Sequence, residues 1–429
     1  MKTRRHKHKG GNIIGSGGYG CVFRPSLKCR GQSRTKKKMV SKLMETKYAQ
    51  QEYNEIVQYK NILNTIPNYQ DYFLLENITI CDPDKIDKSD LTNYIDKCHA
   101  LNQDYGESYI NAHLDEFKIL TIPDGGIDLE KYMKNIEYAT LPSVNNRLID
   151  LLVHGIIPMN KLGILHADIK QSNILINNKH AKLIDWGLAF MFSFDKIPLR
   201  LKDRQISYNL PFSIILFNRL FDEMYANYLK EPTQTPHAFM KQYVNYYFEY
   251  QGSGHFNGIK RAFKMVFMDT WNEDTAIDFI VDYLVKVVQA HTSNKKFNSL
   301  SYFTKVFIHI ADIWGMLTCY GSIMEHLHLS YTLLNKAEKL LFNKLKANIL
   351  TYVYYAHTSQ NDVNKLYSTL VPELLALNKL FINCSKFRSP INFSQTTNRM
   401  PSLPPTQSIT TQRSQKIMSK IKKQIHKML

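Results

Sequence analysis

The N-terminal part of the chain alternates short apolar runs with one long helical pattern. Apolar residues at the three- and four-residue spacing of a helix face run from residue 46 to residue 66. The remaining apolar runs are short and are predicted to be strands: residues 12–14, 21–23, 38–44, 72–80 and 117–122. We therefore predict a small β-rich unit, about residues 12–122, that contains one long helix.

From about residue 143 onward helical periods dominate, and they are interrupted only near residues 164–187. Periodic apolar patterns continue to about residue 383. The pattern therefore predicts that a larger helical unit, about residues 127–383, follows the β-rich one. The expected fold class is α+β, with both units contained in residues 12–383.

Positive charge gathers at the two ends of the chain. The formal net charge is +18; residues 1–44 hold 13 Lys or Arg, residues 374–429 hold ten, and neither segment holds an acidic residue. We predict a basic flexible arm at residues 1–11 and a basic flexible tail, rich in Ser, Thr, Gln and Pro, at residues 384–429. These ends are suited to contact a polyanion or an anionic membrane surface, although two solvated tails would have the same composition.

The cysteine pattern favours a reducing compartment. The six cysteines are Cys21, Cys29, Cys81, Cys98, Cys319 and Cys384. They form no Cys-x-x-Cys pair and no zinc-site spacing, so we predict free thiols rather than a disulfide framework. Residues 1–9 are cationic with no apolar core after them, unlike a secretory signal. Residues 307–324 are apolar but contain a histidine and an aspartate, which predicts a buried helix rather than a membrane span. We expect a soluble, intracellular protein without a transmembrane segment.

A glycine cluster lies between two of the predicted strands. It consists of Gly15, Ser16, Gly17, Gly18, Tyr19, Gly20, Cys21 and Val22. Glycines at this spacing allow the backbone to turn sharply and to bring its N–H groups against phosphate oxygens. A Rossmann fingerprint needs a helix directly after the glycines, whereas a strand is predicted here. The spacing is that of the kinase loop Gly-x-Gly-x-x-Gly-x-Val, although a plain hairpin also explains a lone cluster.

Lys42 lies on the next apolar run. Burying a lysine is costly unless a phosphate or a carboxylate pairs with it. In the kinase arrangement such a lysine holds the α- and β-phosphates and is itself held by a glutamate of the following helix. Glu52 and Glu55 both lie on that helix, and we favour Glu55 because its neighbours fit the inward-facing apolar side. Lys38 is the alternative lysine.

The segment from His166 to Asn173 places four polar functional residues in eight positions. Phosphoryl transfer depends mainly on positioning and on charge stabilisation. Asp168 would accept or orient the proton of an attacking hydroxyl, and Lys170 would neutralise charge on the transferring phosphoryl group. Asn173 would supply an oxygen to Mg²⁺, which prefers oxygen ligands. His166 is predicted to brace the loop.

Asp185 follows Asn173 by 12 residues, at the end of a predicted short strand and directly before Trp186 and Gly187. In isolation this is an aspartate in a turn. Placed after the 166–173 segment, its carboxylate is suited to the Mg²⁺ that bridges the β- and γ-phosphates. Asn173 and Asp185 are therefore the predicted metal ligands.

Over about residues 12–212 these motifs follow the order found in eukaryotic-type protein kinases, and the chain resembles that family. The sequence of residues 166–175, 183–190 and 209–213 is similar to that of the serine/threonine kinases of giant DNA viruses, the mimivirus type. The resemblance implies a two-lobed protein-kinase-like fold, ATP and Mg²⁺ as cofactors, Ser/Thr phosphorylation of a protein substrate, and a location in the host cytoplasm or the virion. Lys170 is typical of Ser/Thr kinases rather than tyrosine kinases.

Residues 118–129 resemble the kinase hinge, which hydrogen-bonds the adenine edge. The resemblance makes Leu120 the residue that guards the back of the nucleotide pocket. Asp128 would either touch the ribose or cap the helix that follows, and capping is the commoner role.

The chain departs from the kinase pattern at three places. Ala167 replaces the arginine that normally pairs with a phosphorylated activation loop, so constitutive activity is expected. Trp186 replaces the usual Phe. Residues 210–212 keep only a proline of the usual Ala-Pro-Glu, and the aspartate that normally follows is not identified, so the part that binds the substrate is divergent.

Two other functions fit the same residues. A small-molecule phosphotransferase of this fold shares the His-x-Asp and Asn positions but usually lacks Lys170 and the glycine-rich sequence. A pseudokinase scaffold would not need Lys42, Asp168, Asn173 and Asp185 together. A serine/threonine protein kinase is therefore the expected enzyme.

Overall fold

The computed structural model describes residues 12–32, 38–102, 104–134, 136–202, 204–268, 272–355 and 363–386. The predicted arm at residues 1–11 lies outside this part, and so does the predicted tail at residues 384–429 except for its first three residues, of which 384 and 385 end the last helix. The described residues form two compact units. Of the described residues, the sheet unit comprises residues 12–50 and 79–121, and the helical unit comprises residues 51–78 and those from 122 to 386.

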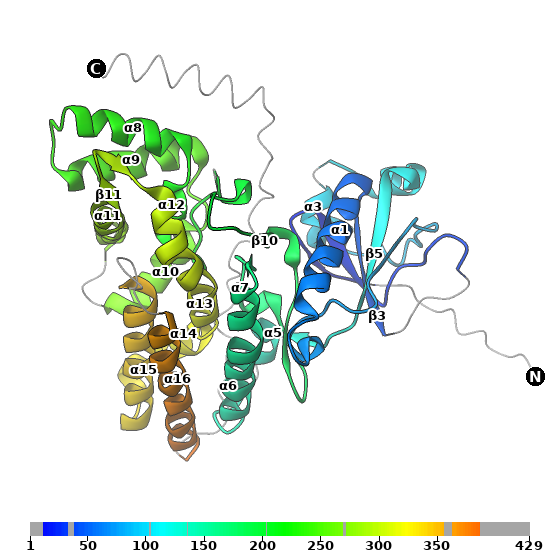
Figure 1. Cartoon of the computed structure of the whole chain (residues 1–429). Helices are drawn as coiled ribbons and strands as arrows, with labels where there is room; N and C mark the ends of the chain where they lie inside the picture. The colour runs from blue at the N-terminus through cyan, green and yellow to red at the C-terminus, as the bar shows by residue number, and fades with distance from the viewer. Residues whose placement is uncertain are drawn as a thin grey trace, which may run out of the picture. The chain divides into compact units, whose positions relative to one another are not determined.

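The fold class is mixed α+β, as predicted: a five-stranded sheet lies in the N-terminal part and the remainder is mostly helical (Figure 1). The sheet has the order β1-β2-β3-β5-β4. Its strands are β1 (Asn12–Ser16), β2 (Gly20–Arg24), β3 (Met39–Glu45), β4 (Thr79–Cys81) and β5 (Phe117–Pro123). β2 pairs antiparallel with both β1 and β3. Phe23, Leu43, Phe117 and Ile119 are fully buried and form the centre of this unit's core.

The predicted strand at residues 72–80 is wrong for most of its length. Only Thr79–Cys81 forms a strand, and the residues before it form a 3-10 turn (Tyr69–Asp71) and a loop. Asn77 has a left-handed backbone (φ 54°), which interrupts an extended run. Phe73 instead makes one isolated parallel bridge with Leu183.

Residues 82–116 form an insertion between β4 and β5 in the sheet unit. Its helices are α2 (Tyr94–Lys97), α3 (His99–Asn102) and α4 (Glu107–Ala112), and a 3-10 turn (Leu114–Glu116) precedes β5. Tyr94, Leu101 and Ile110 are each at most 1% exposed and join the same core as the sheet. The insertion is therefore a packed part of the unit rather than an open loop.

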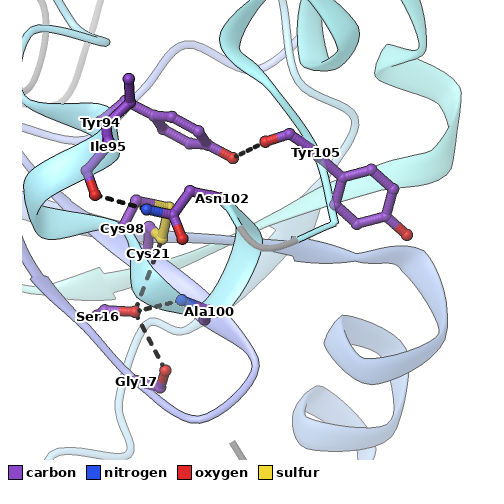
Figure 2. Close-up of a disulfide and its surroundings, with 9 residues drawn as sticks. All are labelled: Ser16, Gly17, Cys21, Tyr94, Ile95, Cys98, Ala100, Asn102 and Tyr105. Carbon is purple, nitrogen blue, oxygen red and sulfur yellow. Dashed lines mark hydrogen bonds between the residues drawn. A yellow bond between two sulfur atoms is a disulfide. The ribbon is translucent and has the colours of Figure 1, made fainter. Parts of the chain in front are cut away.

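Two disulfides cross the sheet unit, and they correct the prediction of free thiols. Cys21 is bonded to Cys98 and Cys29 to Cys81 (Figure 2 shows the first). The partners are 77 and 52 residues apart in sequence, yet folding brings their Cα atoms to 5.3 and 5.7 Å, a separation that suits a disulfide. Scattered spacing therefore hid the pairing. Cys319 and Cys384 are free and buried.

α1 (Thr46–Leu63) has residues in both units. The first elements that follow residue 126 in the helical unit are short. These are β6 (Ile127–Asp128), α5 (Leu129–Met133), α6 (Leu141–Asp150), α7 (Ile157–Lys161), β7 (Ile164–Leu165), β8 (Ile174–Ile176), β9 (Ala181–Leu183) and β10 (Phe190–Met191). A π-helical stretch, Leu151–Ile156, joins α6 to α7. Strands β7 to β9 account for the predicted interruption of the helical pattern near residues 164–187.

Helices make up most of the remainder of the helical unit. They are α8 (Arg219–Lys230), α9 (Pro236–Gln251), α10 (Phe256–Phe267), α11 (Glu273–Ala290), α12 (Ser299–Tyr302), α13 (Ile308–Thr318), α14 (Gly321–Leu329), α15 (Lys336–Ile349) and α16 (Val363–Ser385), with a small hairpin of β11 (Thr292–Ser293) and β12 (Lys296–Phe297). α16 lies beside α6 and α15 (Figure 1). Asn145 of α6 donates to the backbone oxygen of Leu374 at 2.8 Å, which ties α6 to α16.

α13 is the central helix of this unit, and it confirms that the apolar stretch at residues 307–324 is buried. Nine of its eleven residues are buried. Trp314 and Phe212 lie edge to face, with ring centroids 4.9 Å apart, within an aromatic core. Among the described residues no single helix is long and apolar enough to cross a membrane; one bent pair, Ser299–Thr318 with Gly321–Leu329, meets that test by length and composition only.

Candidate active site

The segment from residue 166 to residue 173 connects β7 to β8 in the helical unit and brings three predicted residues together. Asp168 is 6% exposed, and its Oδ2 accepts from Lys170 Nζ and from Asn173 Nδ2, both at 2.8 Å. Its Oδ1 accepts from Asn209 Nδ2 at 2.9 Å. Three donors thus fix both oxygens of one buried carboxylate.

The charges around Asp168 keep it ionised. Burial by itself would raise the pKa of Asp168, but the positive charges of Lys170 and Arg204 and the hydrogen bonds from Lys170 and Asn209 outweigh it, and the net effect is a lowered pKa. The carboxylate is therefore an anion at neutral pH and can accept a proton or a hydrogen bond from a hydroxyl group.

Asp312 of α13 binds the backbone of this loop through two hydrogen bonds. Its Oδ2 accepts the amide N–H of His166 at 3.0 Å and its Oδ1 accepts that of Ala167 at 2.8 Å. Ala167 has a left-handed backbone (φ 55°), a conformation that needs such support. Sequence patterns did not identify Asp312 as a support for this loop. Its signal was a lone aspartate in an apolar helix, which we interpreted only as unfavourable for a membrane span.

A glycine permits α13 to approach the loop closely. A Cβ atom on Gly315 would lie 2.6 Å from the backbone oxygen of Ile169, which is too close for any side chain. One residue earlier, Trp314 Nε1 donates to the backbone oxygen of Tyr208 at 2.9 Å. α13 therefore supports both the 166–173 segment and the segment that carries Asn209.

Arg204 provides a guanidinium group beside the loop. Its Nη2 donates to the backbone oxygen of Ala167 at 2.6 Å. Its charge acts on Asp168 and Asp312. Arg204 thus reaches the loop at Ala167 from 37 residues downstream. Sequence reasoning did not identify it, because no spacing connects the two positions.

A chain of polar side chains leads from Asp168 to His255. Asn209 Nδ2 donates to Asp168, so its Oδ1 is the acceptor for Ser207 Oγ. Ser207 Oγ has one hydrogen to donate, so it accepts from His255 Nδ1 at 2.7 Å, which fixes His255 as the Nδ1–H tautomer. Burial, followed by the positive charge of Lys170, lowers the pKa of His255 to about 4. The chain therefore ends in a neutral histidine.

Asp185 lies at a strained turn after β9. Its backbone is left-handed (φ 64°), and a 3-10 turn, Trp186–Leu188, follows. Ile184 N–H donates to the backbone oxygen of Asn173 at 3.0 Å. The Nε2 of His166 lies 3.1 Å from the backbone oxygen of Ile184. Hydrogen bonds therefore hold the segment of Asp185 against the loop of Asn173, and His166 has the bracing contact that was predicted for it.

The donor set of Asn173 and Asp185 suits a hard cation. Asn173 Nδ2 is committed to Asp168, so its amide oxygen is the end that a cation would bind. The described residues contain no group of three or more His, Cys, Asp or Glu side chains that could hold a metal by themselves. Mg²⁺ at these two residues would therefore take its remaining oxygens from phosphate and water.

Trp186 packs inside the helical unit. It is 3% exposed, and its ring lies 5.1 Å from that of His166, 5.5 Å from that of Tyr59 and 5.6 Å from that of Phe73. Tyr59 also donates its hydroxyl to the backbone oxygen of Ala189 at 2.8 Å. This aromatic cluster accommodates the large indole ring of Trp186.

Glu55 has a partner that was not expected. Its carboxylate binds Arg200, which also donates to the backbone oxygens of Gly187 at 3.2 Å and Ala189 at 2.7 Å. Glu52 is the more buried of the two candidate glutamates, at 7% exposed. The pairing of Lys42 with either glutamate stays a prediction.

The glycine cluster in the sheet unit forms a tight turn between β1 and β2. Gly17 N–H donates to the backbone oxygen of Gly20 at 2.8 Å. A Cβ on Gly20 would lie 2.4 Å from the backbone oxygen of Leu43, so this position requires glycine. Ser16 ends β1, and the ring of Tyr19 stacks on that of Tyr48 with centroids 4.7 Å apart. Of the other members, Gly15 lies on β1, Gly18 lies in the turn, and Cys21 and Val22 lie on β2.

Lys42 lies on β3, opposite Val22 of β2. Its side chain reaches the turn, because a Cβ on Gly17 would lie 3.3 Å from Lys42 Cε. Lys42 is 6% exposed, whereas the alternative, Lys38, is exposed before the strand begins. The sheet unit thus brings the predicted phosphate-binding residues together.

Leu120 and Asp128 are the two residues singled out in the predicted hinge. Leu120 is fully buried on β5, opposite Ile80 of β4. Asp128 caps α5: its Oδ1 accepts from Lys131 N–H at 2.9 Å, and its Oδ2 pairs with Lys131 Nζ. Of the two roles considered for Asp128, the structure has the capping one.

No protein-family model matches the chain.

Proposed function

We propose that this protein is a serine/threonine protein kinase that transfers the γ-phosphoryl group of ATP, with Mg²⁺, to hydroxyl groups of protein substrates. In this proposal the sheet unit and the helical unit are the two lobes of a protein-kinase-like fold. One observation carries the proposal: the buried, ionised carboxylate of Asp168 is fixed by Lys170, Asn173 and Asn209. The order of motifs in the sequence supports a relation to the serine/threonine kinases of giant DNA viruses.

The helical unit supplies the groups for the transfer. Asp168 accepts the proton of the substrate hydroxyl as its oxygen forms the new bond to phosphorus, and the bond to the leaving ADP oxygen breaks. Lys170, 2.8 Å from that carboxylate, offsets negative charge on the moving phosphoryl group. Asn173 and Asp185 would hold Mg²⁺, which supplies further positive charge when bound.

The sheet unit supplies the groups that bind the nucleotide. Backbone N–H groups of the turn at residues 17–20 are suited to phosphate oxygens. Lys42 contributes a compact positive charge next to that turn. Leu120 contributes an apolar wall at the adenine side. Contact of the basic ends of the chain with nucleic acid or an anionic membrane would be compatible with this phosphoryl transfer.

The surroundings of Ala167 support activity without phosphorylation of the chain. In kinases with an arginine at this position, a phosphate on the activation loop supplies its partner. Here Arg204 bonds the backbone of Ala167 directly and lies near the carboxylates of Asp168 and Asp312. The segment after Asp185 is therefore held to the loop by groups already in the chain.

The test is incubation with radiolabelled ATP and Mg²⁺, with a mixture of proteins as acceptor. We expect label on protein Ser and Thr with the wild type, and a loss of at least about a hundredfold for Asp168→Asn and Lys42→Ala. Asp282→Asn and Lys286→Ala, both exposed on α11, are the matched controls and should keep full activity.

The same assay separates the alternatives. Incorporation that neither Asp168→Asn nor Lys42→Ala reduces would overturn the proposal. Label on small metabolites alone would instead identify a small-molecule phosphotransferase. Binding of ATP by the wild type without any turnover would identify a pseudokinase scaffold.

A further inference from the structure

The turn that the proposed function assigns to nucleotide phosphates is attached on both sides to the insertion at residues 82–116. Ser16, the last residue of β1, pairs with Cys21 of β2 and so closes the hairpin just outside the turn. Cys21 is bonded to Cys98, and Ser16 Oγ accepts the N–H of Ala100 at 2.9 Å (Figure 2). One short segment, residues 98–100, therefore holds both strands of the hairpin.

The attachment point is itself firmly built. Tyr94 donates its hydroxyl to the backbone oxygen of Tyr105 at 2.8 Å, and Asn102 Nδ2 donates to that of Ile95, so the segment is closed by its own hydrogen bonds (Figure 2). Cys21 and Cys98 are both fully buried. A bond from a buried hairpin to a packed helical segment limits how far the turn between its strands can move.

Without the disulfide the two attachments are unequal. The hydrogen bond from Ala100 to Ser16 can persist, but β2 is then held to the insertion only by packing. Backbone N–H groups bind phosphate best when they are already positioned, because ordering them on binding costs free energy. The turn with two free thiols should therefore bind phosphate more weakly than the bonded turn.

We propose that Cys21 and Cys98 form a reversible disulfide that positions the glycine-rich turn, so that the oxidised protein binds ATP more tightly than the reduced one. This inference rests on the proposed function. Reduction adds two electrons and two protons to the bond and yields two thiols; dithiothreitol supplies them and becomes its cyclic disulfide. Because both sulfurs are buried, the reductant reaches them only when the insertion opens locally.

The second disulfide offers a matched control. Cys29 lies in the connection between β2 and β3, and Cys81 ends β4. It closes a loop of comparable length, with a sequence separation of 52 against 77, but it is bonded to neither residue that closes the turn. Cys29→Ser therefore removes one disulfide of this unit without releasing the turn.

The experiment measures the Kd and KM for ATP of the full chain, with and without dithiothreitol, for the wild type, Cys98→Ser and Cys29→Ser. We expect the reductant to weaken ATP binding by the wild type about threefold to thirtyfold, with a smaller effect on kcat. Cys98→Ser should match the reduced wild type and ignore the reductant, whereas Cys29→Ser should stay sensitive. An oxidised wild type that binds ATP no better than Cys98→Ser would overturn the proposal.

Two readouts do not depend on enzymatic activity. Alkylation before reduction, followed by mass spectrometry, should leave Cys21 and Cys98 unmodified, because disulfide-bonded cysteines do not react. Alkylation of both cysteines in the protein as purified would show free thiols and overturn the proposal. Amide hydrogen exchange in residues 12–24 should rise in Cys98→Ser and not in Cys29→Ser. If no form binds ATP but hydrogen exchange changes in this way, the proposed kinase function is wrong and the positioning of the turn by the Cys21–Cys98 disulfide is supported. If ATP binds and hydrogen exchange is the same in both variants, only the positioning of the turn by this disulfide is wrong.

Discussion

At the scale of single residues, the arrangement around Asp168 depends on groups that approach it from several segments. Lys170 and Asn173 are its neighbours in the chain, whereas Asn209 comes from 41 residues downstream and donates to the other oxygen. A carboxylate held on both oxygens has one orientation. In the proposed function, the orientation of this carboxylate for proton transfer therefore depends on Asn209 as much as on the residues of its own loop.

Asn209→Ala should lower kcat about tenfold to a hundredfold, because Asp168 then rotates more freely, while the KM for ATP changes little. Asn209→Asp should be at least as harmful, since it places a second negative charge beside Asp168. Steady-state kinetics of the purified variants measure both effects. Asn178→Ala, at an exposed position, is the control, and equal kcat values for Asn209→Ala and the wild type would contradict the role of Asn209.

His255 should make the folded protein less stable in acid. Its pKa is about 4 when folded, against an ordinary value of 6.5, because burial and the charges of Lys170 and Arg204 outweigh the attraction of Asp168. Between these two values the unfolded chain binds a proton that the folded chain does not. The free energy of unfolding therefore falls as the pH falls through this window, by about 2 to 3 kcal/mol at pH 4.5.

Urea unfolding at pH 7 and pH 4.5 measures this loss. The test is the difference between the wild type and His255→Asn, which keeps a donor for Ser207 but does not titrate. The wild type should lose more stability than the variant on acidification. The same loss in both proteins would show that His255 titrates normally.

At the scale of elements, α13 is the support on which the loop is built. Its Asp312 binds two backbone N–H groups, and its Gly315 allows the helix to lie against Ile169. A side chain on Gly315 would push directly on a backbone oxygen, which has no rotamer through which to escape.

Gly315→Ala should therefore destabilise the helical unit by about 1 to 3 kcal/mol and reduce activity, although alanine favours helices. Gly321→Ala is a closely matched control, because nothing lies within 4 Å of a Cβ at the first residue of α14. Urea unfolding of both variants measures the difference. A Gly315→Ala protein as stable as Gly321→Ala would contradict the close packing of α13 on the loop.

Sequence patterns predicted the elements and site residues that are determined by their near neighbours. The strands around the glycine turn, the long helix α1 and the segment from His166 to Asn173 are of this kind. Asp312, Arg204 and His255 were not predicted as site residues. The spacing of apolar residues indicates which positions are buried, but it does not indicate which distant group a buried residue contacts. The prediction of free thiols was wrong for Cys21, Cys29, Cys81 and Cys98 for the same reason.

At the scale of the whole molecule, the two units differ in what stabilises them. The sheet unit is small and carries both disulfides, whereas the helical unit has a large aromatic core and free, buried Cys319 and Cys384. A small unit buries a smaller share of its surface, so covalent links matter more to it.

Reduction should therefore destabilise the sheet unit selectively. In the chain-entropy account, each of its disulfides contributes about 4 kcal/mol. Calorimetry with and without dithiothreitol should show a transition that moves to lower temperature, while one assigned to the helical unit stays in place. Proteolysis of the reduced protein should give first cuts within residues 12–50 or 79–121. A single transition that reduction leaves unchanged would contradict this division of stability.

Asp312 also determines when the loop can form during synthesis. It follows Ala167 by 145 residues, a length that a ribosome takes roughly 7 to 30 seconds to add. Throughout that interval the backbone N–H groups of His166 and Ala167 are outside the ribosome without the carboxylate that holds them. We expect the nascent loop to be protease-sensitive until α13 has emerged, so chains arrested before residue 312 should be degraded or held by chaperones. Such chains should also lack the kinase activity that we propose.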